Sequence, residues 1–569
     1  MQIHIEKNAQ VRMRDGVALA TDVLRPADGG PHPTLVQRMP YNKEPSWLAN
    51  SSVDLLRLVQ AGYAVVNQDT RGTGASDGTF RPFLDDRSDG VDTLEWAAAQ
   101  PWSSGTLGMV GISYYAGTQW LAAMEGPPGL KAIAPQSFHY DPYLGWLYQG
   151  GAFSLGVAVR WSLNYFSPSV RDKLKEYIGT VDLFPQLVRR LPITDMPMLD
   201  EVAPFYFEWL AHPAYDDYWR AWSPMANFDT VAVPPLITTG WYDAFVGDAG
   251  ITYTEMKKRG ASQAARRPQL IIGPWSHGWW GADFPERGYG ERADKEVFDL
   301  TAKTIRWFDH HLKGADNGVA QEKPVHLFIM GANEWRDEDD WPLPDTSFTR
   351  YYLRSAGRAN TASGDGFLST EAPGDERDDV YRYDPMDPVP TIGGQNLLPP
   401  ARMPANAGPR DQRRLDPRAD ILFYTTPALE RATEVTGPVE LVLFISSSAP
   451  DTDFTGKLVD VHPDGRAEIL TEGILRVRYR ESFSEPRLME PGKIYEIRID
   501  LMATGNLFAA GHRIRLEVAS SNFPRFDRNT NSGNTIASDT EADVQVAVNR
   551  VHHDSDHPSH LVLPIIHRA

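Results

Sequence analysis

The chain of 569 residues contains no cysteine. Disulfide scaffolds, thiolate zinc sites, iron–sulfur clusters and cysteine hydrolases all need a thiol or a thiolate, so each of these classes is excluded. If the protein uses a covalent nucleophile, we therefore expect that nucleophile to be a serine hydroxyl.

Long apolar runs and clusters of basic residues are also missing. No stretch approaches the roughly 18 apolar residues that a membrane-spanning helix needs, and residues 1–7 lack the pattern of a signal peptide. The 75 acidic residues outnumber the 56 basic ones, and the resulting net charge of −19 opposes binding to the phosphates of nucleic acids. We therefore expect a cytoplasmic protein that binds neither membranes nor nucleic acid.

Short apolar segments alternate with amphipathic ones in the first quarter of the chain. Strands are predicted at 33–38, 63–68, 107–110 and 130–134, and helices at 89–100 and 118–124. This alternation is typical of βαβ units and of a mainly parallel sheet. The chain is too long for one hydrophobic core, so further domains are expected.

The pattern changes twice along the chain. An aromatic-rich stretch with helical periodicity interrupts the α/β pattern, which resumes at 235–239 and ends in a long amphipathic stretch at 293–312. Beyond residue 340, short strand-like segments separated by turns predict a β sandwich or jelly roll, wrapped by irregular loops over 363–418. The expected boundaries are 1–139 and 229–340 for the α/β core, 140–228 for a helical cap inserted in it, and 341–569 for the β domain. A separate helical domain is the alternative to the cap.

Ser113 is the candidate nucleophile. A strand-like segment ends just before it and a helical one follows, which is the strand–turn–helix context of a nucleophile elbow. Gly111, two residues earlier, relieves crowding in such a turn, but Tyr115 stands where a second glycine is usual. On this motif alone, a turn without a catalytic role remains the alternative.

Two further residues have the types and the positions that such a serine needs. Asp243 follows the predicted strand at 235–239, and His277 follows the strand at 269–272. The order serine, acid, histidine at successive strand ends is that of α/β-hydrolases, in which the histidine removes the serine proton and the acid orients the histidine. The sequence therefore predicts a triad of Ser113, Asp243 and His277.

Seven short motifs lie between residues 38 and 336. They are RMPYNK at 38–43, QDTRGTGASDG at 68–78, QPW at 100–102, GISY at 111–114, GWYD at 240–243, GPWSH at 273–277 and EWR at 334–336. Together they resemble the family that contains cocaine esterase, X-Pro dipeptidyl peptidase, α-amino-acid ester hydrolase and glutaryl cephalosporin acylase. The resemblance implies an α/β-hydrolase core with a helical cap insertion, followed by an all-β jelly-roll domain.

The resemblance also implies a role for each site residue. Ser113, Asp243 and His277 correspond to the family's triad, and the Tyr41 hydroxyl and the Tyr114 backbone N–H correspond to the two donors of its oxyanion hole. A phenol keeps its proton until about pH 10, so Tyr41 can donate at neutral pH. The alternative for Tyr41 is a tyrosine of the core.

One residue departs from the family pattern, and one of the matching motifs could be mistaken for a phosphate-binding loop. Ala116 stands three residues after Ser113, where relatives carry glycine, and a small residue on a helix is expected to be tolerated there. The glycine-rich turn at 69–78 has no Gly-Lys-Ser/Thr sequence and so is not a phosphate loop. We expect Asp69 and Arg71 to form a buried pair that braces the elbow.

Three aromatic residues are candidates for the acyl pocket. In the cocaine esterase branch two cap tryptophans and a phenylalanine line this pocket, and they correspond to Trp146, Trp161 and Phe245. Such walls suit a bulky or aromatic acyl group, although the rings can also serve only the core of the cap. The acidic residues that could instead hold a substrate ammonium, Asp216, Asp217, Asp283 and Glu286, show no spacing that singles out such a site.

We therefore predict a serine carboxylesterase that acts on a small-molecule ester through an acyl-enzyme on Ser113, without a metal or an organic cofactor. An acylase, an α-amino-acid ester hydrolase or an X-Pro dipeptidyl peptidase on the same scaffold is the nearer alternative. A non-catalytic carbohydrate-binding protein is the remote one. A homodimer remains an option.

Overall fold

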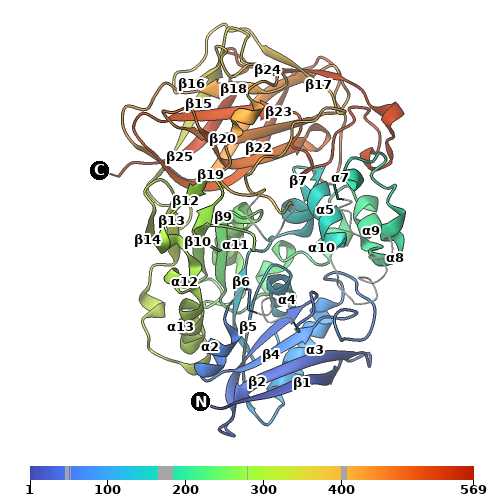
Figure 1. Ribbon diagram of the computed structural model, residues 1–569, viewed down its shortest axis with the longest axis vertical. Coiled ribbons are helices and arrows are strands. Elements are labelled where there is room, and N and C mark those ends of the chain that lie inside the picture. The colour runs from blue at the N-terminus through green and yellow to red at the C-terminus, as the bar shows by residue number, and fades with distance from the viewer. Residues whose placement is uncertain (45–49, 52, 164–183, 279, 399–405, 569) are drawn as a thin grey trace.

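The computed structural model describes residues 1–44, 50–51, 53–163, 184–278, 280–398 and 406–568. Figure 1 shows three parts: an α/β part that holds the N-terminus at the bottom, a helical part at one side, and a β domain at the top. Among the residues described, no helix is both long enough and apolar enough to cross a bilayer.

A ten-stranded sheet forms the centre of the α/β part, in the order β1-β2-β4-β3-β5-β6-β9-β10-β13-β14. Its strands are β1 (Ile3–Arg12), β2 (Ala18–Pro26), β3 (His32–Met39), β4 (Ala64–Asp69), β5 (Ser103–Ile112), β6 (Leu130–Gln136), β9 (Leu236–Tyr242), β10 (Gln269–Ser276), β13 (Val325–Ile329) and β14 (Glu334–Glu338). The strands from β4 to β13 in this order are parallel, and antiparallel pairs close both edges. Because the strands are parallel, the carboxyl ends of β5, β9 and β10 meet at one edge of the sheet.

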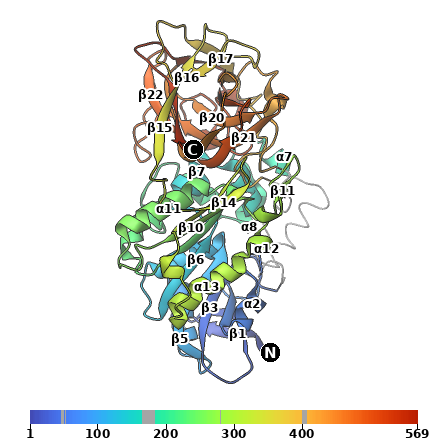
Figure 2. The same ribbon diagram turned by 90° about the vertical axis from the view of Figure 1, so that its left-hand side faces the viewer.

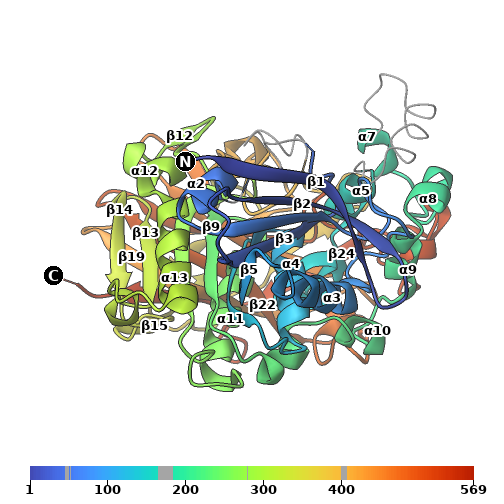
Figure 3. The same cartoon turned by 90° about the horizontal axis from the view of Figure 1, so that it is seen from below.

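Helices cover both faces of this sheet, as Figure 3 shows from below. The helices are α2 (Leu55–Gln60), α3 (Asp86–Ala98), α4 (Tyr114–Ala123), α11 (Val246–Arg259), α12 (Lys295–Phe298) and α13 (Leu300–Lys313). The amphipathic stretch at 293–312 is not one helix, because Asp299 adopts a left-handed conformation (φ 52°) and caps α13 by accepting from the Ala302 N–H at 2.9 Å. Figure 2 shows α13 lying along the face of the sheet that is turned to the viewer.

The helical part lies between β6 and β9 in the chain. It contains η1 (Pro142–Leu147), β7 (Tyr148–Gln149), β8 (Ala152–Phe153), α5 (Leu155–Ser162), α7 (Phe184–Leu187), α8 (Pro197–Val202), α9 (Phe205–Ala211), α10 (Asp217–Arg220) and η2 (Met225–Thr230). It contacts the β domain as well as the α/β part, since the Tyr215 N–H donates to the Phe483 carbonyl at 2.9 Å. We call this segment the cap.

The described residues of the β domain form two sheets. The larger has the order β16-β15-β25-β19-β24-β17, with β22 paired to β19, and the smaller has the order β18-β23-β20-β21. The strands are β15 (Thr346–Arg354), β16 (Phe367–Ser369), β17 (Asp379–Tyr383), β18 (Leu422–Thr425), β19 (Thr433–Ser447), β20 (Asp453–Val461), β21 (Ala467–Arg476), β22 (Tyr495–Phe508), β23 (Arg513–Ala519), β24 (Ala547–His552) and β25 (His560–Ile566). The prediction of irregular loops over 363–418 was therefore incomplete, because β16 and β17 lie there. β16 pairs with the preceding strand β15, and β17 pairs with β24, which is distant in sequence.

Candidate active site

Ser113 lies in the sharp turn between β5 and α4. Its backbone has φ 58° and ψ −124°, a strained conformation for a residue with a side chain. Gly111 has φ 144°, and a Cβ at this position would lie 2.4 Å from the Cβ of Tyr115. The turn therefore needs glycine before the serine, whereas Tyr115 fits after it because its side chain packs over Gly111.

His277 connects Ser113 to Asp243. Its Nε2 lies 3.0 Å from the Ser113 Oγ, and its Nδ1 lies 3.2 and 3.3 Å from the two carboxylate oxygens of Asp243. The carboxylate of Asp243 is buried and also accepts from the Phe245 N–H at 3.0 Å, which fixes its position. The three residues from the ends of β5, β9 and β10 thus form a continuous chain of hydrogen bonds.

The Tyr41 hydroxyl is the first of two hydrogen-bond donors near Ser113. The indole N–H of Trp161 donates to the Tyr41 hydroxyl oxygen at 2.9 Å, and Tyr41 also hydrogen-bonds to Ser113. Because an indole can only donate, the proton of Tyr41 is left free to point toward the serine. Burial raises the pKa of Tyr41 to about 12, although its hydrogen bonds to Trp161 and Ser113 act the other way.

The backbone N–H of Tyr114 is the second donor. Tyr114 is the first residue of α4, where a backbone N–H has no acceptor inside the helix. Among the residues that the structure describes, no group accepts a hydrogen bond from this N–H. The Tyr114 side chain points elsewhere: its hydroxyl donates to Asp86 at 2.5 Å and accepts from the Phe83 N–H at 2.9 Å. Asp86 is paired in turn with the fully buried Arg38 at 3.0 Å.

The predicted pair between Asp69 and Arg71 is wrong. Asp69 accepts from the backbone N–H and the ammonium of Lys43, at 2.7 and 3.1 Å. Arg71 forms two hydrogen bonds to Asp89, at 2.7 and 3.0 Å, and a third to Asp15. The two residues bond to different neighbours, so both are structural but they are not partners of each other.

The three predicted pocket residues belong to one series of aromatic contacts. Trp161 and Trp146 meet edge to face with ring centroids 5.4 Å apart, and the Phe245 ring lies 5.4 Å from the His277 ring. His139 connects the two pairs, because it stacks on Trp146 at 5.4 Å and meets Phe245 at 5.8 Å. All eight predicted site residues are therefore brought together.

Two residues near the site were not predicted from the sequence. His139 is buried, and burial lowers its pKa well below the ordinary value, so it behaves as a neutral ring. Asp86 supports Tyr114 from α3. Neither lies in a motif, and only its position after β6 could have drawn attention to His139.

The acidic residues considered for a substrate ammonium do not form a cluster. The side chain of Asp217 is 99% exposed, and Asp216 bonds to His212 at 2.6 Å. Glu286 is paired with Arg410 at 2.8 Å. These contacts do not favour an ammonium site.

One group of side chains in the described part of the chain has the spacing of metal ligands. It consists of Asp460, His462 and His512 in the β domain. The guanidinium of Arg466 lies 3.4 Å from the ring nitrogens of His462, and a positive charge at this distance opposes binding of a metal cation.

The chain is similar to known proteins over nearly its whole length. Residues 15–279 match the X-Pro dipeptidyl-peptidase (S15) family, and residues 317–562 match the X-Pro dipeptidyl-peptidase C-terminal non-catalytic domain. The chain is 44% identical to cocaine esterase of Rhodococcus sp. over 99% of each chain. It is 28% identical to a putative serine esterase of Mycobacterium bovis, covering 98% of this chain and 94% of the relative.

A solved structure has a similar fold over nearly the whole chain. An α-amino acid ester hydrolase superposes with a TM-score of 0.81 at 24% identity, covering 99% of this chain and 96% of that one. The predicted fold class, an α/β-hydrolase core with a cap and a C-terminal β domain, is confirmed.

Proposed function

The chain belongs to the X-Pro dipeptidyl-peptidase (S15) family and is a serine ester hydrolase, and from this premise we propose that Ser113 is its nucleophile. His277 is the general base, and Asp243 orients the base. The observation that carries the proposal is the unbroken series of hydrogen bonds from Ser113 Oγ through His277 to Asp243.

Acylation follows from these contacts. The Asp243 carboxylate accepts only, so it holds the His277 proton on Nδ1 and leaves the lone pair of Nε2 facing Ser113 Oγ. Nε2 takes the serine proton as Oγ attacks the ester carbonyl, and the same proton then passes to the leaving alcohol. The product is an acyl-enzyme on Ser113, which water hydrolyses with His277 again as the base.

The Tyr41 hydroxyl and the Tyr114 N–H stabilise the oxyanion of the tetrahedral intermediate. Both face the serine before substrate arrives, so little reorganisation is needed as charge develops, and one such donor typically contributes about 10²–10³ in kcat. The raised pKa of Tyr41 keeps this donor protonated well into the alkaline range.

The aromatic walls support a preference for aromatic or bulky acyl groups. Trp146, Trp161 and Phe245 are nearly fully buried and present apolar ring surface next to the triad. An aromatic acyl group gains apolar burial and ring contacts there. The name of the 44% identical relative, cocaine esterase, supports a small-molecule ester as the substrate.

The proposed assignment is tested by purified Ser113→Ala protein, with Ser347→Ala as a control because Ser347 is exposed on β15. We expect hydrolysis of p-nitrophenyl benzoate to fall to the background rate in Ser113→Ala and to be unchanged in the control. Wild-type activity in Ser113→Ala would overturn the assignment. Values of kcat/KM for a benzoyl ester, its amide and an α-amino ester separate an esterase from an acylase or a peptidase.

A cytoplasmic location and a homodimer stay predictions from the sequence.

A further inference from the structure

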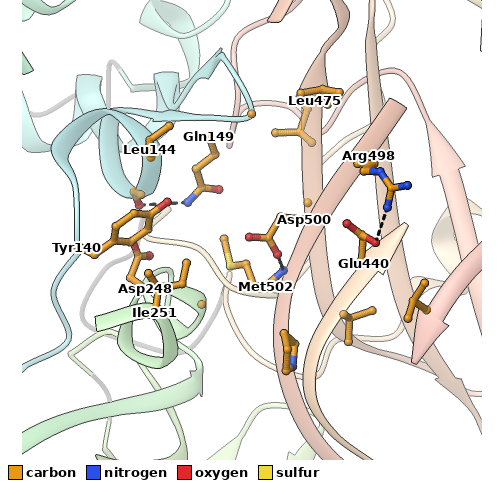
Figure 4. Close-up of a pocket in the computed structure, with 18 of the residues that line it drawn as sticks. Tyr140, Leu144, Gln149, Asp248, Ile251, Glu440, Leu475, Arg498, Asp500 and Met502 are labelled. Atoms are coloured by element: carbon orange, nitrogen blue, oxygen red, sulfur yellow. Dashed lines mark hydrogen bonds and ion pairs between the residues drawn. The ribbon is translucent and has the colours of Figure 1, made fainter. Parts of the chain in front are cut away.

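A cavity of about 660 Å³ lies where the α/β part, the cap and the β domain meet. Figure 4 shows Tyr140, Gln149 and Asp248 on one side of it and residues of the β domain, Asp500 among them, on the other. None of the eight predicted site residues lines this cavity. Its volume falls within the range of about 300–1,000 Å³ that is typical of small-molecule sites.

Asp248, in the first turn of α11, is the most unusual residue of the cavity wall. It is only 4% exposed, and one carboxylate oxygen accepts from the Tyr140 N–H at 3.3 Å. No side chain among the described residues donates a hydrogen bond to this carboxylate. Gly145 makes room for this carboxylate, because a Cβ at this position would lie 1.8 Å from Oδ1. Burial raises the pKa of Asp248 well above its ordinary value, and the charge of Asp500 adds to the effect.

Asp500 and Tyr140 complete a cluster of polar groups around the cavity. Asp500 lies on β22, where its carboxylate accepts from the Met502 N–H at 2.7 Å, and its exposed side chain shows that the cavity reaches solvent. Burial raises the pKa of Tyr140 well above its ordinary value, and the charges of Asp248 and Asp500 raise it further. All three side chains line the same cavity, as Figure 4 shows. The Tyr140 hydroxyl makes no hydrogen bond to a described residue.

Among the residues that the structure describes, no cationic side chain forms an ion pair with Asp248 or Asp500. Arg498 is the one basic side chain among the described residues that line the cavity, and it is already paired with Glu440 at 3.1 Å and with Glu496 at 2.8 Å. The rest of the wall is largely apolar and includes Leu144, Ile251 and Leu475. The cavity thus combines two carboxylates that lack a cation with an apolar surface.

We propose that this cavity binds an organic cation with an apolar body, such as an arylalkylamine, at a site separate from the triad. The ammonium lies between Asp248 and Asp500, where its positive charge favours the ionised form of both side chains. The apolar body packs against Leu144, Ile251 and Leu475. The proposal does not depend on the esterase assignment.

Isothermal titration calorimetry of the full-length protein tests it with two probes that share one apolar body. Tryptamine carries an ammonium, and tryptophol carries a hydroxyl at the same position. We expect tryptamine to bind at least tenfold more tightly than tryptophol. The double variant Asp248→Asn/Asp500→Asn is expected to lose this preference, whereas the control Asp217→Asn, which removes the charge of a fully exposed side chain, is expected to keep it.

A second variant keeps the test independent of how well the double variant folds. Ile251→Trp, on α11, fills the cavity and leaves both carboxylates in place, and we expect it to lose tryptamine binding. Equal affinity for the two probes would overturn the proposal. So would wild-type affinity for tryptamine in either the double variant or Ile251→Trp.

Discussion

The two walls of the active site are built in different ways. On the side of the α/β part, Ser113, His277, Asp243 and Tyr114 are held by hydrogen bonds and by one strained turn. On the side of the cap, Trp146 meets its neighbours through ring contacts of 5.4 Å. Hydrogen bonds fix direction and ring contacts mainly exclude water. We therefore propose that the first wall carries out the chemistry and that the second selects the acyl group.

Trp161 is the residue that joins the two walls. It belongs to the cap and packs on Trp146, but its indole N–H also donates to the Tyr41 hydroxyl. If the comparison holds, changes on the first wall lower kcat for every ester, changes on the second wall alter the ranking of esters, and Trp161 does both.

The largest effect is expected for Asp243→Asn. An asparagine can still accept from the Phe245 N–H, but its amide favours the wrong tautomer of His277. A change of this kind typically lowers kcat by about 10⁴-fold. We expect such a loss for acetyl and benzoyl esters alike, with an unchanged melting temperature as the control for folding. A loss below tenfold would contradict the role of Asp243.

Tyr41→Phe comes next. The ring packing is kept and the oxyanion loses one donor, so we expect kcat to fall about 10²–10³-fold while KM stays within about twofold. Steady-state kinetics with p-nitrophenyl acetate and p-nitrophenyl benzoate measures both values. A change confined to KM would place Tyr41 in substrate binding and not in the oxyanion hole.

Smaller kinetic effects are expected for substitutions on the cap side, and they differ between Trp161 and Trp146. Trp161→Phe keeps an aromatic wall and removes the donor to Tyr41, so we expect kcat to fall about tenfold for both esters, the equivalent of a bond of about 1.4 kcal/mol.

Trp146→Leu removes ring surface only, so we expect kcat/KM to fall for the benzoyl ester and to change little for the acetyl ester. An equal loss of kcat/KM with both esters in Trp146→Leu would contradict the proposed difference between the two walls.

The smallest effect concerns pH. An ordinary tyrosine loses its proton near pH 10, but burial raises the pKa of Tyr41 to about 12, so the donating form persists between these values and is lost above them. We expect the ratio of kcat between the wild type and Tyr41→Phe to stay constant up to about pH 10.5. If that ratio fell with a midpoint near pH 10, Tyr41 would be solvated like a surface phenol.

The sequence was informative where local patterns determine the structure and less so where distant segments meet. Ser113, Asp243 and His277 each follow an apolar strand, and because parallel strands end at one edge of the sheet, their meeting could be predicted. The break at Asp299 and the strand β17 could not be predicted, since the first depends on a single residue in a left-handed conformation and the second on a partner strand far along the chain.

The same limit explains the site residues that were missed. His139 is defined by the rings around it, and the partners of Asp69 and Arg71 come from three different segments. Neither set of contacts has a sequence spacing that reveals it. Resemblance to the family suggested the pocket tryptophans but not the hydrogen bond from Trp161 to Tyr41.

The central claim, that His277 activates Ser113 for covalent catalysis, is tested most directly by peptide mapping after reaction with a fluorophosphonate. We predict one label per chain, on Ser113, in the wild-type protein and at least a thousandfold slower labelling in His277→Ala, because the hydroxyl then has no base. Label on another residue, or equal labelling of Ser113 in both proteins, would contradict the account.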